Sequence, residues 1–122
     1  MKHNPGFLKL VEAAKARVKE CTIAEAKAKL DRGEVVQFLD VREDHEFAKD
    51  HAKGSRHLAK GIIERDIETL VQDKQAPIIL YCGGGYRSAL AADALRQMGY
   101  TKVISMDGGI KAWRDAGYPM EQ

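Results

Sequence analysis

The heptapeptide CGGGYRS, residues 82–88, holds the residue types of this chain that are best suited to covalent chemistry. It follows the apolar run IILY and precedes an alanine-rich amphipathic stretch, which predicts Cys82 at the end of a buried strand and a helix beginning near Arg87. Ligands of open parallel sheets bind at this end of the strands. The unpaired amides and the dipole of a helix N-terminus stabilise a thiolate there. The loop therefore predicts a nucleophilic cysteine.

The three glycines and Arg87 indicate which kind of group Cys82 would handle. Glycines have no side chain to block an approach, can adopt positive φ, and can turn their N–H groups toward an anion. Arg87 adds a fixed positive charge with a planar set of donors. The simpler interpretation, a buried cysteine followed by an ordinary turn, leaves this combination unexplained. We expect Cys82 to act on an anionic group, and we expect Cys21, which has no such neighbours, to be structural.

The elements that must position this loop alternate between helices and strands. The apolar strands lack a two-residue alternation, as is typical of strands covered on both faces. This pattern predicts an α/β domain of three layers with a mainly parallel central sheet. Helices are expected at residues 7–18, 23–30, 43–50, 62–72, 87–98 and 108–117, and strands at 35–41, 55–59, 76–82 and 102–106. Thr22 and Glu25 are spaced as a capping box at the start of the second helix.

Length and composition exclude several classes of function. The chain has 122 residues, which suits one domain, and a net charge of +2 with basic and acidic residues interspersed, which argues against a nucleic-acid or membrane partner. No apolar run reaches the roughly 20 residues of a membrane span, and the N-terminus lacks a signal-like apolar segment. Two distant cysteines do not form a disulfide framework, which favours the reducing cytoplasm. His51 and His57 lack metal-ligand spacing to them.

Four segments together resemble the rhodanese-like sulfurtransferase family. They are the Cys82 loop, LDVRE at 39–43, HAKGSRHL at 51–58 and DGGIKAW at 107–113. The third departs from the family pattern, because Ser55 replaces an alanine and no proline follows His57. The resemblance covers about residues 20–118. It implies a rhodanese-like fold with about five mainly parallel strands over residues 20–122, preceded by an N-terminal helical extension at 1–19.

The resemblance also implies an activity. Such an enzyme moves sulfane sulfur from thiosulfate or a persulfide to a thiol, or to cyanide in vitro, through a persulfide on the loop cysteine. The partners would be a small sulfur-containing anion or persulfide and a thiol acceptor, which a protein could carry. No metal or organic cofactor is implied, and a monomer or weak dimer is expected. The implied catalytic residues are Cys82 and Arg87, with Gly83, Gly84, Gly85, Tyr86 and Ser88 binding substrate and Asp40 and Arg42 supporting the site.

Two alternatives stay open at this point. Cysteine-dependent phosphatases and arsenate reductases also combine a cysteine, a backbone cradle and an arginine, but with five intervening residues. Cys82 and Arg87 are separated by four, and the tighter loop suits a single sulfur atom better than a tetrahedral oxyanion. The second alternative is a module with a protein partner. A regulatory binding module without turnover is disfavoured by the presence of Cys82, whereas a sulfur carrier is not distinguished from a thiosulfate enzyme by the sequence.

Overall fold

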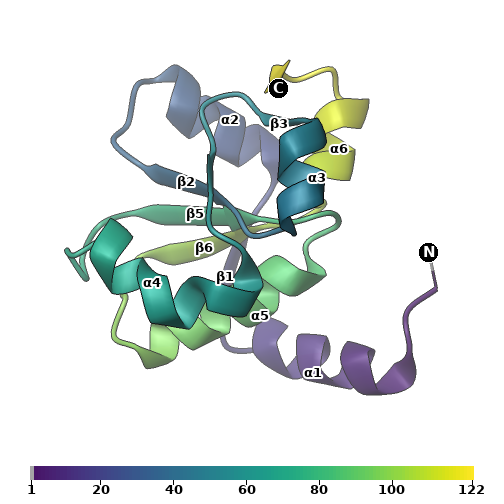
Figure 1. Ribbon diagram of the computed structural model, residues 1–122, viewed down its shortest axis with the longest axis vertical. Helices are drawn as coiled ribbons and strands as arrows, with labels where there is room; N and C mark the ends of the chain where they lie inside the picture. The colour runs from purple at the N-terminus through teal and green to yellow at the C-terminus, as the bar shows by residue number, and fades with distance from the viewer. Residues whose placement is uncertain (1) are drawn as a thin grey trace.

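The computed structural model describes residues 2–122, which fold around a five-stranded parallel sheet (Figure 1). The strand order is β1-β6-β5-β2-β4, and every neighbouring pair is parallel. The strands are β1 (Lys19–Cys21), β2 (Gln37–Asp40), β4 (Arg56–His57), β5 (Ile78–Tyr81) and β6 (Val103–Met106). A separate antiparallel pair joins β3 (His51–Ala52) to β7 (Met120–Glu121). The predicted α/β class with a parallel central sheet is confirmed.

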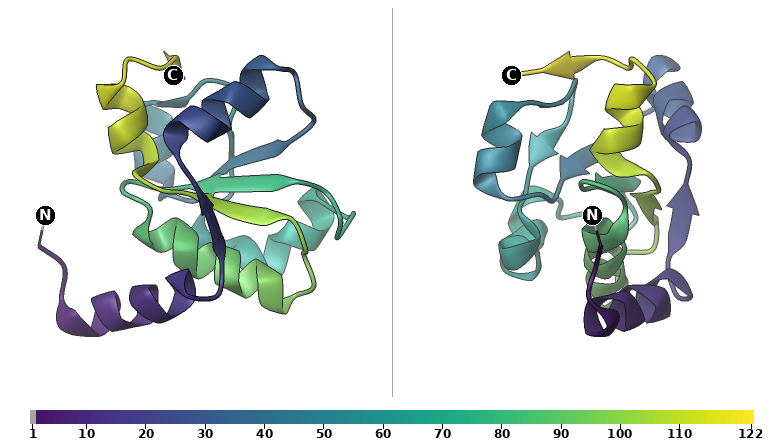
Figure 2. Two further views of the ribbon diagram at one scale, coloured as in Figure 1. Left: turned by 180° about the vertical axis from the view of Figure 1, so that it is seen from behind. Right: turned by 90° about the vertical axis from the view of Figure 1, so that its right-hand side faces the viewer.

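Helices cover both faces of the sheet and give the three layers (Figures 1 and 2). They are α1 (Pro5–Lys15), α2 (Ile23–Asp31), α3 (Asp44–Lys49), α4 (Ile63–Leu70) with a preceding 3-10 turn (Lys60–Ile62), α5 (Tyr86–Gln97) and α6 (Gly109–Asp115). In β5, Ile78 and Leu80 join the core under α4 and α5, whereas Ile79 and Tyr81 join the core that includes Trp113 of α6. This two-sided burial explains why β5 is an uninterrupted apolar run.

The local sequence explains where helix α2 begins, but it does not reveal the shortest strands. The predicted capping box is confirmed at α2: the Glu25 N–H donates to Thr22 Oγ1 at 3.0 Å, and the Thr22 N–H donates to Glu25 Oε1 at 2.8 Å. Three strands were not predicted, namely β1, β3 and β7. They contain only two or three residues each, and β1 buries Cys21 alone. Such strands carry no periodic signal and exist only because neighbouring segments offer hydrogen bonds.

Helix α1 lies along α5 on the outer side of that helical layer (Figure 2). Val11 and Ala14 are buried in this contact surface. Just after α1, Arg17 donates from Nε and one Nη to both carboxylate oxygens of Asp93 on α5, at 3.1 and 2.8 Å. The chain then enters β1 at Lys19, which pairs with β6. The division of the chain at residue 19 stays a prediction, and the contacts show that α1 is packed on the domain.

Among residues 2–122, none of the helices combines the length and the apolar composition that crossing a membrane would require.

Candidate active site

Cys82 lies at the carboxyl end of β5, and the glycine loop leads directly into α5, as predicted. Gly85 is the N-cap residue of α5 and has a φ of 101°, a left-handed conformation that favours glycine. A Cβ at this position would also approach Asp107 Oδ1 and the Gly108 nitrogen at 3.3 Å. Of the three loop glycines, only Gly85 has a positive φ. The sharp turn from strand to helix is therefore made at one residue rather than spread over three.

The first turn of α5 surrounds the sulfur of Cys82. The N–H groups of Gly85 and Ser88 point to Cys82 Sγ at N···S distances of 3.2 and 3.3 Å. The thiol donates to Ser88 Oγ at 3.5 Å, and that hydroxyl is 2.8 Å from Ser105 Oγ on β6. The Cys82 side chain is buried but forms part of a pocket wall. Two amides at a helix N-terminus can stabilise negative charge on this sulfur.

Helix α6 fixes the loop from the other side. The Ile110 N–H donates to the carbonyl of Cys82 at 2.8 Å, and the Lys111 N–H donates to the carbonyl of Gly83 at 3.1 Å. Gly109 has a φ of 56°, and a Cβ there would lie 2.5 Å from the Cys82 carbonyl oxygen. Gly108 and Gly109, both of positive φ, turn the chain into α6. They also allow the α6 backbone to touch the Cys82 loop, which the sequence did not indicate.

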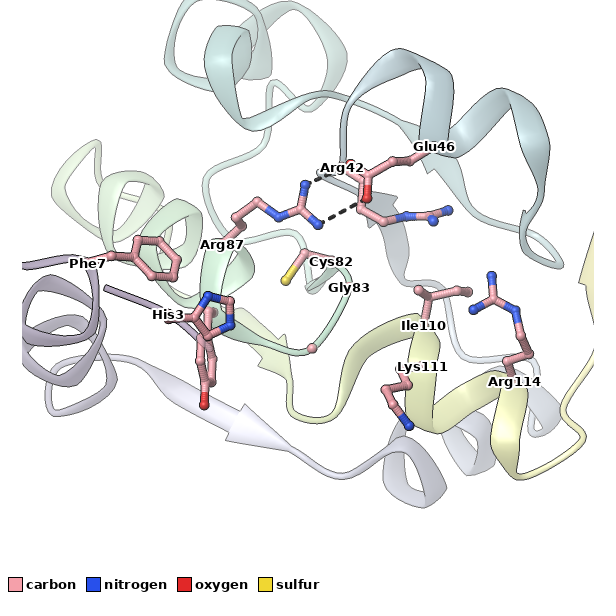
Figure 3. A pocket seen from close by; sticks show the side chains of 12 residues that line it. His3, Phe7, Arg42, Glu46, Cys82, Gly83, Arg87, Ile110, Lys111 and Arg114 are labelled. Atoms are coloured by element: carbon pink, nitrogen blue, oxygen red, sulfur yellow. Dashed lines mark hydrogen bonds and ion pairs between the residues drawn. The ribbon is translucent and has the colours of Figure 1, made fainter. Parts of the chain in front are cut away.

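Arg87 is held by Glu46, a residue that was not predicted from the sequence. The guanidinium donates to the two carboxylate oxygens of Glu46 at 2.7 and 3.2 Å, and Figure 3 shows this pair beside Cys82. The hydrogen bonds from Arg87 are the main cause that lowers the pKa of Glu46 to about 2, and the same pairing raises the pKa of Arg87. Glu46 lies on α3, the helix that follows the strand end at Asp40. This place in the sequence was the only sign that Glu46 could reach the site.

Asp40 and Arg42 form a buried ion pair beneath the site. Arg42 donates to both oxygens of Asp40 over 2.8–3.1 Å, and also to the carbonyl of Asp50 at 2.7 Å. These contacts tie the end of β2 to the segment after α3. His57 contacts the carbonyl of Arg42 at 2.8 Å, and His51 contacts that of Phe47 at 3.1 Å, so both histidines have scaffold partners.

A pocket of about 780 Å³ opens above Cys82 (Figure 3). Its lining includes Cys82, Gly83, Gly84, Tyr86 and Arg87 from the reactive loop, Arg42 and Glu46 from the β2–α3 region, and Ile110, Lys111 and Arg114 from α6. His3 and Phe7, from the N-terminal segment, complete it. Gly85 and Ser88 lie behind this lining and contact the sulfur. The two N-terminal residues were not predicted, since no local pattern shows where α1 docks.

Cys21 is not among the residues that line this pocket and lies buried in β1. Burial raises the pKa of its thiol to about 11, so that it stays protonated at neutral pH. Within residues 2–122, no group of three or more His, Cys, Asp or Glu side chains is arranged to hold a metal ion.

Several known proteins are similar in sequence to this chain. The model of the rhodanese-like domain family matches residues 22–116. The thiosulfate sulfurtransferase GlpE of Stutzerimonas stutzeri is 36% identical over 97 residues, which cover 80% of this chain and 84% of that protein. YrkF of Bacillus subtilis, whose name proposes a sulfur carrier, is 33% identical over 96 residues. That match covers 79% of this chain but 51% of YrkF, so the chain spans about half the length of this relative.

A solved structure from Rhodopseudomonas palustris also resembles the whole chain. It is a protein of unknown function, described as a possible tyrosine phosphatase, with a TM-score of 0.89 and 31% identity over 99% of this chain and 98% of its own. The parallel sheet, the cysteine loop at its carboxyl edge and the family match over most of the chain lead to one conclusion. The chain belongs to the rhodanese-like domain family.

Proposed function

We propose that this protein is a sulfurtransferase that carries sulfane sulfur as a persulfide on Cys82. One observation carries the proposal: two amides from the first turn of α5 converge on Cys82 Sγ at 3.2 and 3.3 Å. An anionic sulfur at this position gains charge-assisted hydrogen bonds that a neutral thiol does not. The names of the sulfurtransferase and carrier relatives support the same reaction class.

The proposed first step transfers one sulfur atom to the enzyme. The Cys82 thiolate attacks the outer sulfur of the donor, for example thiosulfate. A new S–S bond forms to Cys82, the S–S bond of thiosulfate breaks, and sulfite leaves with the electron pair of that bond. In the second step a thiol attacks the outer sulfur of the persulfide and becomes a persulfide, which regenerates the Cys82 thiolate. Splitting the transfer in this way is covalent catalysis, and it requires a reduced Cys82, in keeping with the cytoplasm expected from the sequence.

Phosphate-ester hydrolysis is the second candidate, because of the description given to the Rhodopseudomonas palustris neighbour. The site favours it less. Four residues rather than five separate Cys82 from Arg87, and the Arg87 guanidinium is already paired with Glu46. With a pKa of about 2, Glu46 is ionised at neutral pH, so this pocket carboxyl has no proton to give to a leaving group.

The intact mass of the purified protein tests the proposal. Exposure to thiosulfate, polysulfide or glutathione persulfide should add one sulfur atom, and cyanide should remove it. Cys82→Ser should abolish the mass gain, while Cys21→Ser should retain it. A gain that persists in folded Cys82→Ser and disappears in Cys21→Ser would overturn the assignment. An aryl phosphate assay on the same proteins tests the second candidate, and efficient Cys82-dependent hydrolysis would favour it.

A further inference from the structure

Three aromatic side chains form one wall of the Cys82 pocket, and two of them come from the N-terminal segment. The ring centroids of His3 and Tyr86 are 4.8 Å apart, those of His3 and Phe7 are 5.2 Å apart, and those of Phe7 and Tyr86 are 6.2 Å apart. All three side chains are half-buried. Figure 3 shows His3 and Phe7 on the side of Cys82 opposite to Ile110, Lys111 and Arg114. We call His3, Phe7 and Tyr86 the aromatic wall.

The aromatic wall is held in place by residues that do not themselves line the pocket. Lys15 places its Nζ 5.4 Å from the centroid of the Tyr86 ring and also pairs with Glu20 at 3.0 Å. The two-point contact of Arg17 with Asp93 anchors the end of α1 to α5, which is the helix that carries Tyr86. The wall residues of the N-terminal segment and of α5 therefore stay together, and they line the same pocket as Cys82.

The charges around the pocket do not single out a small dianion. Each cationic side chain of the arginines and lysine that line it has a carboxylate partner within 3.0 Å. The pairs are Arg42 with Asp40, Arg87 with Glu46, Lys111 with Asp115 and Arg114 with Asp50. The volume of about 780 Å³ falls in the range of sites for organic ligands, roughly 300–1,000 Å³. An inorganic sulfur anion would leave the aromatic wall without a contact.

We propose that the aromatic wall binds the carbon body of an organic thiol and thereby selects the acceptor of the Cys82 sulfur. This inference rests on the persulfide function proposed above. The acceptor thiolate attacks the outer sulfur of the protonated Cys82 persulfide. The S–S bond of the persulfide breaks, Cys82 leaves as a thiolate, and the acceptor becomes an organic persulfide that keeps the proton. An apolar group next to the acceptor sulfur packs on the rings of His3, Phe7 and Tyr86.

The test compares two thiols of similar acidity, benzyl mercaptan and 2-mercaptoethanol. The full chain is first loaded with sulfur by polysulfide and freed of excess reagent, and loss of the persulfide is then followed by intact mass. Wild-type protein should react with benzyl mercaptan at least about tenfold faster than with 2-mercaptoethanol. Phe7→Ala should reduce the ratio of the two rates about five- to tenfold, as loss of an aromatic contact implies. His3→Ala, tested as a separate variant, should also reduce it.

Leu10→Ala is the matched control, because Leu10 lies on α1, as Phe7 does, and is 63% exposed. It should keep the wild-type ratio. The thermal midpoint of each variant shows whether it has folded, and the use of a ratio cancels any loss of active protein. A wild-type ratio near one, or a ratio unchanged in both Phe7→Ala and His3→Ala, overturns the wall proposal while the persulfide function stands. Failure of wild-type protein to load any sulfur refutes the function itself.

Discussion

If the proposed sulfur transfer from thiosulfate takes place, replacing Glu46 by glutamine should make it faster. The substitution removes the negative charge that faces Arg87 at 2.7 and 3.2 Å. It keeps the shape of the side chain and an oxygen that can accept from the Glu43 N–H, which Glu46 Oε1 does at 2.9 Å. Because glutamine also serves at this position of a capping box, α3 should retain its N-terminus. The main change is therefore electrostatic.

The size of the effect follows from Coulomb's law. A dianionic donor between Cys82 and Arg87 would lie at roughly 7 Å from the Glu46 carboxylate, where an effective dielectric constant of about 80 gives a repulsion of about 1.2 kcal/mol. Its removal corresponds to about an eightfold rise in kcat/KM for thiosulfate. The ratio of kcat/KM between Glu46→Gln and wild-type protein should fall toward one at about 1 M salt, where the screening length is only about 3 Å.

The assay measures kcat/KM for thiosulfate with saturating cyanide, at low and high ionic strength. Asp44→Asn is the control, since it removes one negative charge from the same helix at a side chain that is 95% exposed. It should change kcat/KM less than twofold. A fall in kcat/KM in folded Glu46→Gln would refute the reasoning, because it would mean that Glu46 holds Arg87 in the orientation that the donor requires.

Three further predictions test the same site. Because the pKa of Glu46 is lowered to about 2, its carboxylate stabilises the folded protein above about pH 4.5, and this stabilisation is lost as pH falls toward about 2. Acidification over this range should therefore lower the free energy of unfolding of wild-type protein by about 1–2 kcal/mol more than that of Glu46→Gln. Equal acid profiles would contradict this. Gly109→Ala should lower the thermal midpoint and slow persulfide formation, because its Cβ would meet the Cys82 carbonyl oxygen at 2.5 Å; unchanged values for both would count against the role of α6. One residue inserted between Gly85 and Tyr86 should abolish persulfide formation, measured by intact mass, because the two amides would leave Cys82 Sγ; full sulfur loading in that variant would argue against the cradle.

The local sequence determined most of what surrounds Cys82. The apolar run before it and the amphipathic stretch after it placed the cysteine between β5 and α5. The capping box at Thr22 was predicted correctly because it depends on residues three positions apart. Three short strands escaped prediction, since β1, β3 and β7 have only two or three residues each and too few positions to show a period.

Only the tertiary structure decided which residues far along the chain meet at the sulfur. Glu46 reaches Arg87 because parallel strands β2 and β5 are neighbours and bring their carboxyl ends to one edge. His3 and Phe7 reach the pocket because α1 packs along α5, an arrangement that an amphipathic helix pattern does not specify. An amphipathic pattern states that one face will be buried, but not against which partner. The sequence by itself thus determined the proposed nucleophile and the glycine loop around it, and the packing of distant elements determined the charge and the aromatic wall beside them.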